Sequence, residues 1–121
     1  MNDSSSHGIT VIPVNRALII TLPSDLGFGL MDAIKLKVRQ GLETHSAKAL
    51  ILECSGVELM DRTEFDQLRS IAQMVRLHGL TTYLVGLNPW IASYLADQDV
   101  ELTGIHARRG LDEALELVNG R

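Results

Sequence analysis

Apolar residues gather in short blocks along the chain, and the first block has the pattern of strands. Residues 9–22 are mostly apolar and are divided near the middle by Asn15 and Arg16. This pattern predicts two strands, residues 9–14 and 17–22, joined by a tight turn. Pro13 favours an edge position for the first strand, because proline cannot donate a hydrogen bond to a neighbouring strand.

The remaining blocks alternate between helical and strand-like patterns. Leu30, Ile34, Val38 and Leu42 recur every four residues, which predicts a helix that ends between residues 41 and 45. Later stripes predict helices over residues 61–78, from residue 88 onward, and over residues 111–118. Ile91, Tyr94 and Leu95 form the expected apolar face of the helix that follows residue 88. Short apolar or β-branched runs predict strands at residues 47–54, 81–87 and 102–106.

Several helix ends carry recognisable capping residues. Asp61 and Glu64 are spaced as a capping box, in which each side chain bonds the other residue's backbone amide. Gly79 is suited to end that helix at the C′ position. Asn88 followed by Pro89 is typical of an N-cap and the first helical position.

The resulting order of elements is β-β-α-β-α-β-α-β-α, which predicts an α/β fold. The strands form one mixed sheet, beginning with a β-hairpin and flanked by about four helices. Residues 9–121 then make a single domain. Residues 1–8 are small and polar, and we expect a disordered lead-in there.

Composition excludes several classes of protein. The chain has 121 residues and a net charge of −4, and its aromatic content is 4%, so a nucleic-acid binder is disfavoured. A single cysteine rules out an internal disulfide framework. No apolar run approaches the length of a membrane span, and the N-terminus lacks the pattern of a secretory signal. We therefore expect a cytoplasmic protein of bacterial type.

Candidate catalytic and metal-binding patterns are weak. The histidines are too widely spaced for a zinc site, and Cys54 lacks the partner of a Cys-x-x-Cys motif. Ser55 does not lie in a nucleophile elbow. Gly27 and Gly29 precede a helix, but Asp32 occupies the third glycine position of a dinucleotide fingerprint, so a flexible turn is favoured over a phosphate site. The sequence predicts no catalytic residues, no metal and no cofactor.

Residues 53–61, Glu-Cys-Ser-Gly-Val-Glu-Leu-Met-Asp, resemble the strand–loop–Asp segment of STAS domains, the anti-sigma factor antagonist family. Residues 74–89 resemble that family's helix, strand and Gly-x-x-Pro turn. Residues 100–102 and 110–115 resemble its last strand and helix. Within the family, the chain resembles the small single-domain antagonist of the stressosome. The resemblance implies a non-catalytic interaction module that binds a switch-type Ser/Thr kinase and other STAS-domain proteins.

The resemblance also implies a phosphorylation switch, from which this chain departs. The family usually carries Ser or Thr after the Asp that matches Asp61, and the kinase phosphorylates it. Here that position is Arg62, which has no hydroxyl. Stressosome relatives carry a second acceptor Thr where this chain has Tyr94. Thr63 and Ser93 are neighbouring hydroxyls that remain candidate acceptors.

The helix that starts at Asp61 offers a candidate partner surface. Arg62, Asp66, Arg69 and Gln73 share a polar stripe opposite the apolar one. The predicted partner-binding set is Met60, Asp61, Arg62, Thr63, Asp66, Arg69 and Gln73. Two other interpretations stay open: an ordinary solvated face, with Arg62 paired to Glu58 or Asp66, and a STAS accessory subunit of a lipid transporter or a small-ligand sensor. A small enzyme is the least favoured class, and a homo-oligomer formed through the exposed first strand is compatible with the pattern.

Overall fold

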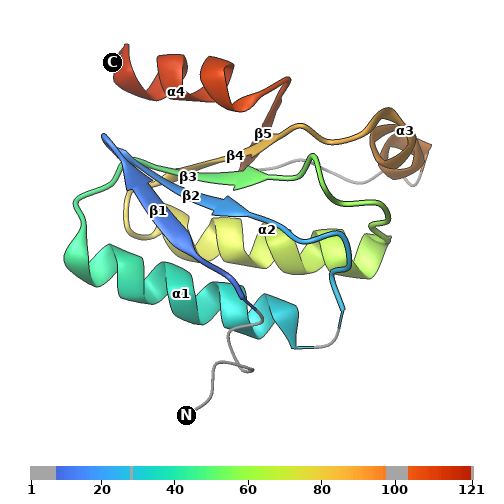
Figure 1. Cartoon of the computed structure of the whole chain (residues 1–121), viewed down its shortest axis with the longest axis horizontal. Coiled ribbons are helices and arrows are strands. Elements are labelled where there is room, and N and C mark those ends of the chain that lie inside the picture. Colours follow the sequence, from blue (N-terminus) through green and yellow to red (C-terminus); the bar gives the residue numbers. More distant parts are fainter. Residues whose placement is uncertain (1–7, 28, 98–103, 121) are drawn as a thin grey trace.

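A computed structural model describes residues 8–27, 29–97 and 104–120 (Figure 1). The order of elements is the predicted one. Within the described residues the strands are β1 (Val11–Val14), β2 (Ala17–Thr21), β3 (Ala49–Glu53), β4 (Thr81–Val85) and β5 (Ile105–Arg108). The helices are α1 (Leu30–Thr44), α2 (Arg62–Arg76), α3 (Pro89–Asp97) and α4 (Leu111–Asn119). The mixed α/β fold with helices packed on one sheet is confirmed. The predicted lead-in, except Gly8, lies outside the described residues.

The described strands form a single sheet in the order β1-β2-β3-β4-β5. β1 pairs antiparallel with β2 across the turn at Asn15 and Arg16, so the opening hairpin is confirmed. The other neighbours are parallel, with Ile20 opposite Leu52 and Glu53 opposite Val85. Pro13 lies in the edge strand β1, where its missing N–H costs the sheet nothing.

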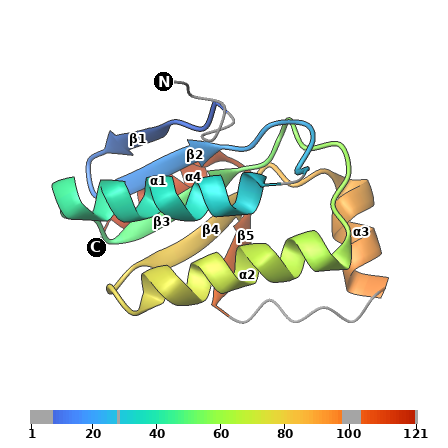
Figure 2. The ribbon, with the colours of Figure 1, turned by 90° about the horizontal axis from the view of Figure 1, so that it is seen from below.

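The helices cover the two faces of the sheet unequally. Figures 1 and 2 show α1 and α2 side by side on one face and α4 on the other. The crossovers β2-α1-β3 and β3-α2-β4 advance in the same direction along the sheet. Because such connections have the same handedness, both helices lie on one face. α4 follows the last strand and packs on the opposite face. α3 lies beyond the carboxyl ends of the parallel strands (Figure 1).

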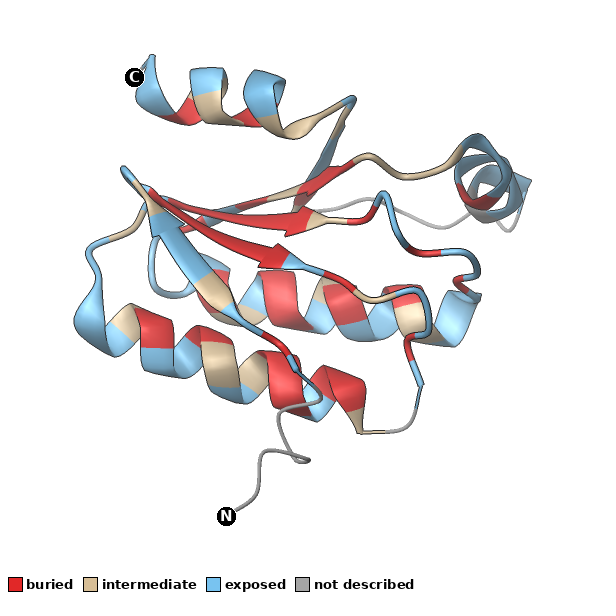
Figure 3. Ribbon diagram, in the orientation of Figure 1, coloured by how far each residue is buried: buried red, intermediate tan, exposed pale blue. Residues whose placement is uncertain are grey.

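Successive side chains of each central strand alternate between a large core on the α1–α2 side and a smaller core under α4, and Figure 3 shows these strands buried along most of their length. In β2, Leu18 and Ile20 belong to the large core and Ala17 and Ile19 to the small one. Because these strands are buried on both faces, their sequences are continuously apolar rather than alternating. None of the helices within the described ranges is both long and apolar enough to cross a bilayer.

The last strand differs from its predicted position. It runs over Ile105–Arg108, two residues past the predicted end at residue 106. Residues 102 and 103, and the segment 100–102 that resembles the family's last strand, lie outside the described part. The parallel register sets this position, because Ile105 pairs with Thr82 and Arg108 with Val85. Arg108 is accommodated in an edge strand because its guanidinium lies 5.8 Å from the centre of the Tyr83 ring.

Candidate partner-binding site

The N-terminus of α2 is fixed by the predicted capping box. Asp61 has extended backbone angles, and its Oδ1 accepts a hydrogen bond of 2.8 Å from the Glu64 amide. In return, Glu64 Oε1 accepts a 3.0 Å bond from the Asp61 amide. Two amides at the helix start are thereby satisfied, which holds the residues after Asp61 in a defined place.

The loops around this helix end are tied to the sheet and to α3. The Cys54 amide donates to the Val85 carbonyl at 2.8 Å, so the chain leaving β3 follows the end of β4. The Asn88 side chain donates to the Val57 carbonyl at 3.3 Å and accepts from the Ile91 amide at 2.8 Å. Asn88 is thus the predicted N-cap of α3 and also links α3 to the β3–α2 loop.

The polar stripe of α2 is present, and its charges are paired within the helix. Asp66 Oδ2 lies 3.9 Å from Arg62 Nε, and Asp66 Oδ1 lies 3.3 Å from Arg69 Nη1. Arg62, Asp66 and Gln73 are exposed, whereas the Arg69 side chain is 26% exposed. Exposed ion pairs of this kind add little stability.

The predicted site residues differ in how far they are exposed to solvent. Thr63 and Ser93 are both exposed, on α2 and α3. Tyr94, expected on the buried face of its helix, is instead 44% exposed, because α3 sits beyond the sheet rather than on it. Met60 was predicted to contact a partner, but only 4% of its surface is exposed. Met60 packs in the large core and supports the loop from beneath.

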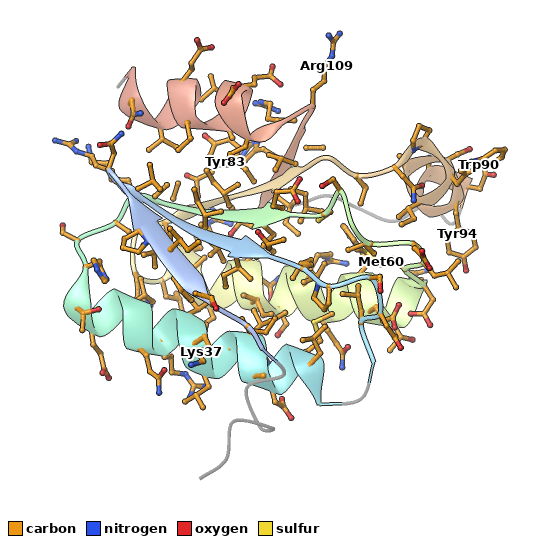
Figure 4. All side chains as sticks on the ribbon, viewed as in Figure 1. Lys37, Met60, Tyr83, Trp90, Tyr94 and Arg109 are labelled. Carbon is orange, nitrogen blue, oxygen red and sulfur yellow. The ribbon has the colours of Figure 1, made fainter. Side chains whose placement is uncertain are left out.

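A groove of about 680 Å³ opens beside the α2 N-terminus, at the carboxyl ends of the parallel strands. This edge of a parallel sheet is where ligand sites commonly form. The groove is lined by Ser24, Asp25, Glu58, Leu59, Met60, Asp61, Glu64, Trp90, Ile91 and Tyr94. Figure 4 shows Trp90 and Tyr94 extending from α3 at the periphery of the molecule.

The groove combines apolar surface with negative charge. Leu59 is 79% exposed and Trp90 is 85% exposed, which is unusual for side chains of their size. Asp25 and Glu58 join the capping carboxylates around the rim, and the described lining residues include no lysine, arginine or histidine. Sequence periodicity missed Leu59 and Trp90 because both fall outside the buried stripes. The available signal was a lone Trp in a first helical turn, out of phase with Ile91.

A smaller groove of about 350 Å³ lies on the other side of Asp61 and Glu64. Thr63 and Gln67 of α2 line it, together with Asp32 of α1 and with Gly27 and Gly29, which precede α1. Gly27 and Gly29 therefore lie beside the candidate surface, although they do not belong to a phosphate-binding fingerprint.

Cys54 is buried under this site. Burial and the neighbouring Glu53 carboxylate raise the pKa of the Cys54 thiol from 9.0 to about 12. Its Sγ donates to the Leu52 carbonyl at 3.4 Å. A protonated, buried thiol is a poor nucleophile, which agrees with a structural role. Among the described residues, no group of three or more His, Cys, Asp or Glu side chains could hold a metal ion.

The chain belongs to the STAS domain family, whose family model matches residues 9–108. Among solved structures it is similar to a serine-to-glutamate variant of RsbS from Moorella thermoacetica, with a TM-score of 0.77 and 19% identity over 93% of this chain and 96% of that one. A chain of the stressosome, described as a signal integration and transduction hub, gives 0.77 and 20% over 92% and 96%.

The unphosphorylated form of SpoIIAA, an anti-sigma factor antagonist, gives a TM-score of 0.73 and 15% identity over 94% of this chain and 98% of that one. No curated protein sequence matches the chain. At these identities the solved structures establish the fold, which is that of anti-sigma factor antagonists and stressosome STAS proteins.

Proposed function

We propose that the protein is a non-catalytic interaction module of bacterial stress signalling that acts in the cytoplasm. It binds a switch-type Ser/Thr kinase and other STAS-domain proteins through the surface formed by Asp61, Arg62, Thr63, Asp66, Arg69 and Gln73, with Met60 beneath it. The family and the fold shared with RsbS and SpoIIAA support this proposal. A buried, protonated Cys54 also fits a protein without nucleophilic chemistry.

One observation carries the proposed mechanism: Arg62 follows the N-cap Asp61 as the first residue of α2 and is exposed. A phosphorylated Ser or Thr at this place would add about two negative charges next to the free amides of the helix start. Arg62 presents a fixed positive charge there instead. The proposed module therefore binds its kinase without being switched by phosphate at this position.

The phosphorylation part of the proposal is tested with the kinase, ATP and mass spectrometry. The natural protein should take up no stoichiometric phosphate, whereas Arg62→Ser should gain phosphate on the new hydroxyl. Arg76→Ser is the matched control, because it places a serine on the exposed surface at the far end of the same helix. Stoichiometric phosphate on Thr63 or Ser93 of the natural protein would show that the switch is retained.

The binding part is tested by kinase capture with charge-reversed variants. Arg62→Glu and Asp66→Lys should each weaken capture, while Glu116→Lys on α4 should not, because α4 covers the opposite face of the sheet. Circular dichroism checks that each variant is folded. Unchanged affinity for both α2 variants would remove this surface from the proposal. Co-purification with membrane ATPase subunits, rather than a kinase, would favour the transporter-subunit alternative.

Association between copies has a structural basis in β1. This strand is an edge of the sheet, and Ile12 on it is exposed. An unpaired edge offers backbone groups to another strand, although Pro13 removes one donor. Sedimentation of the purified protein measures its oligomeric state, and Ile12→Lys should reduce any dimer that forms through this edge.

A further inference from the structure

The groove between α3 and the start of α2 has the character of a docking site for a protein segment. Its walls carry Leu59 of the β3–α2 loop. They also carry Trp90 and Tyr94 of α3, which Figure 4 labels. Exposing this much apolar side chain to water is unfavourable, and a partner that covers it would recover that free energy. The volume of about 680 Å³ is enough for one or two large side chains.

Charge identifies what kind of segment fits. Asp25 and Glu58 lie on the rim, and Asp61 and Glu64 carry two further carboxylates at the α2 end of the groove. The described lining supplies no cation to balance them. Charge of one sign around a partly enclosed groove attracts the opposite sign and raises the rate of encounter.

We propose that this groove binds a protein segment in which a bulky apolar side chain is flanked by lysine or arginine. The apolar side chain packs between Trp90 and Leu59, and the basic residues meet Asp25 and Glu58. The inference rests on the proposed function in one respect, which is that the switch kinase supplies the segment. The groove is continuous with the α2 surface through Asp61 and Glu64, so one partner can contact both.

The protein contains its own reporter for this binding. Trp90 is its single tryptophan, and it is exposed in the groove. The probe is a tryptophan-free synthetic peptide of leucine, lysine and arginine, titrated into the full chain. Binding should move Trp90 fluorescence to shorter wavelength and protect it from acrylamide quenching. Two control peptides, one with glutamate in place of the basic residues and one with serine in place of leucine, should produce neither effect.

Variants assign the binding to the groove. Glu58→Lys with Asp25→Lys should weaken peptide binding by about tenfold or more, as loss of close charge pairs does. Leu59→Ser should also weaken it, and both sets leave the capping box intact. The matched controls are Glu116→Lys, the same charge reversal on α4, and Leu77→Ser, which removes a leucine that is 88% exposed beyond the far end of α2. Neither control should change the affinity.

The outcomes separate this inference from the proposed function. If the basic apolar peptide does not bind, or if groove and control variants bind it equally, the inference is wrong. Kinase capture that depends on Arg62 and Asp66 would leave the proposed function standing in that case. If the peptide binds the groove but no switch kinase is captured, the docking site is supported and the kinase is not its partner.

Discussion

Gly86, in the connection from β4 to α3, should be much less tolerant of alanine than Gly79, and the difference can be worked from the structure. Both residues have left-handed backbones, with φ of 74° at Gly86 and 87° at Gly79. At Gly79, in the turn after α2 that the 3.0 Å hydrogen bond from Leu80 N–H to Val75 O closes, an added Cβ would meet nothing within 4 Å. At Gly86 it would lie 2.8 Å from Glu53 Oε2 and 3.2 Å from the Ser55 amide nitrogen.

An alanine in a left-handed backbone is strained, but it also lowers the conformational entropy of the unfolded chain. The net loss in the free energy of unfolding is about 1 kcal/mol. Gly79→Ala should lower the free energy of unfolding by that amount. The Glu53 side chain can move, but the Ser55 backbone cannot without disturbing the end of β3. Overpacking against it adds roughly 2 kcal/mol, so Gly86→Ala should lose about 3 kcal/mol in total. Urea unfolding of both variants measures the difference. An equal loss in the two would refute the close approach of the β4–α3 and β3–α2 connections.

Three further predictions concern the same region. Asp61→Ala should lower the free energy of unfolding by about 1 kcal/mol in urea titrations, while Asp61→Asn should retain most of the stability because asparagine also caps helices. The Cys54 pKa is raised in the folded protein, so its contribution to stability is complete below pH 9.0 and declines as the pH rises toward about 12. The free energy of unfolding should fall by up to about 1.4 kcal/mol per pH unit across that window, and the Cys54→Ala variant should lack this part of the pH dependence. Trp90→Ala and Leu59→Ser should change stability by less than about 0.5 kcal/mol, since both side chains are exposed, and a larger loss in thermal melts would mean that the groove is structural.

The sequence was sufficient for the fold because each element carries its own local signal. The Asp61–Glu64 capping box and the Asn88 N-cap are short-range interactions, and both form as the spacing predicted. The bounds of β5 differ from the prediction because they are set by its pairing with β4. The hydrophobic pattern of so short a segment carries no information on that pairing. The burial of Met60 and the exposure of Tyr94 also depend on tertiary packing: Met60 is buried in the large core, and Tyr94 is exposed because α3 lies beyond the sheet.

The docking groove illustrates why a surface built from several loops escapes a search along the chain. Helical periodicity relates residues on one helix, and it predicts the polar face of α2. The groove instead is lined by Leu59 and Trp90, which lie on different elements. The Asn88 side chain links these elements, because it donates a hydrogen bond from α3 to the Val57 carbonyl of the β3–α2 loop. Parallel strands end at one edge of the sheet, so the connections after β2, β3 and β4 converge there in any chain with this topology. Large apolar residues in those connections, out of phase with the buried stripes, are therefore the sequence positions to examine for partner contacts in folds of this type.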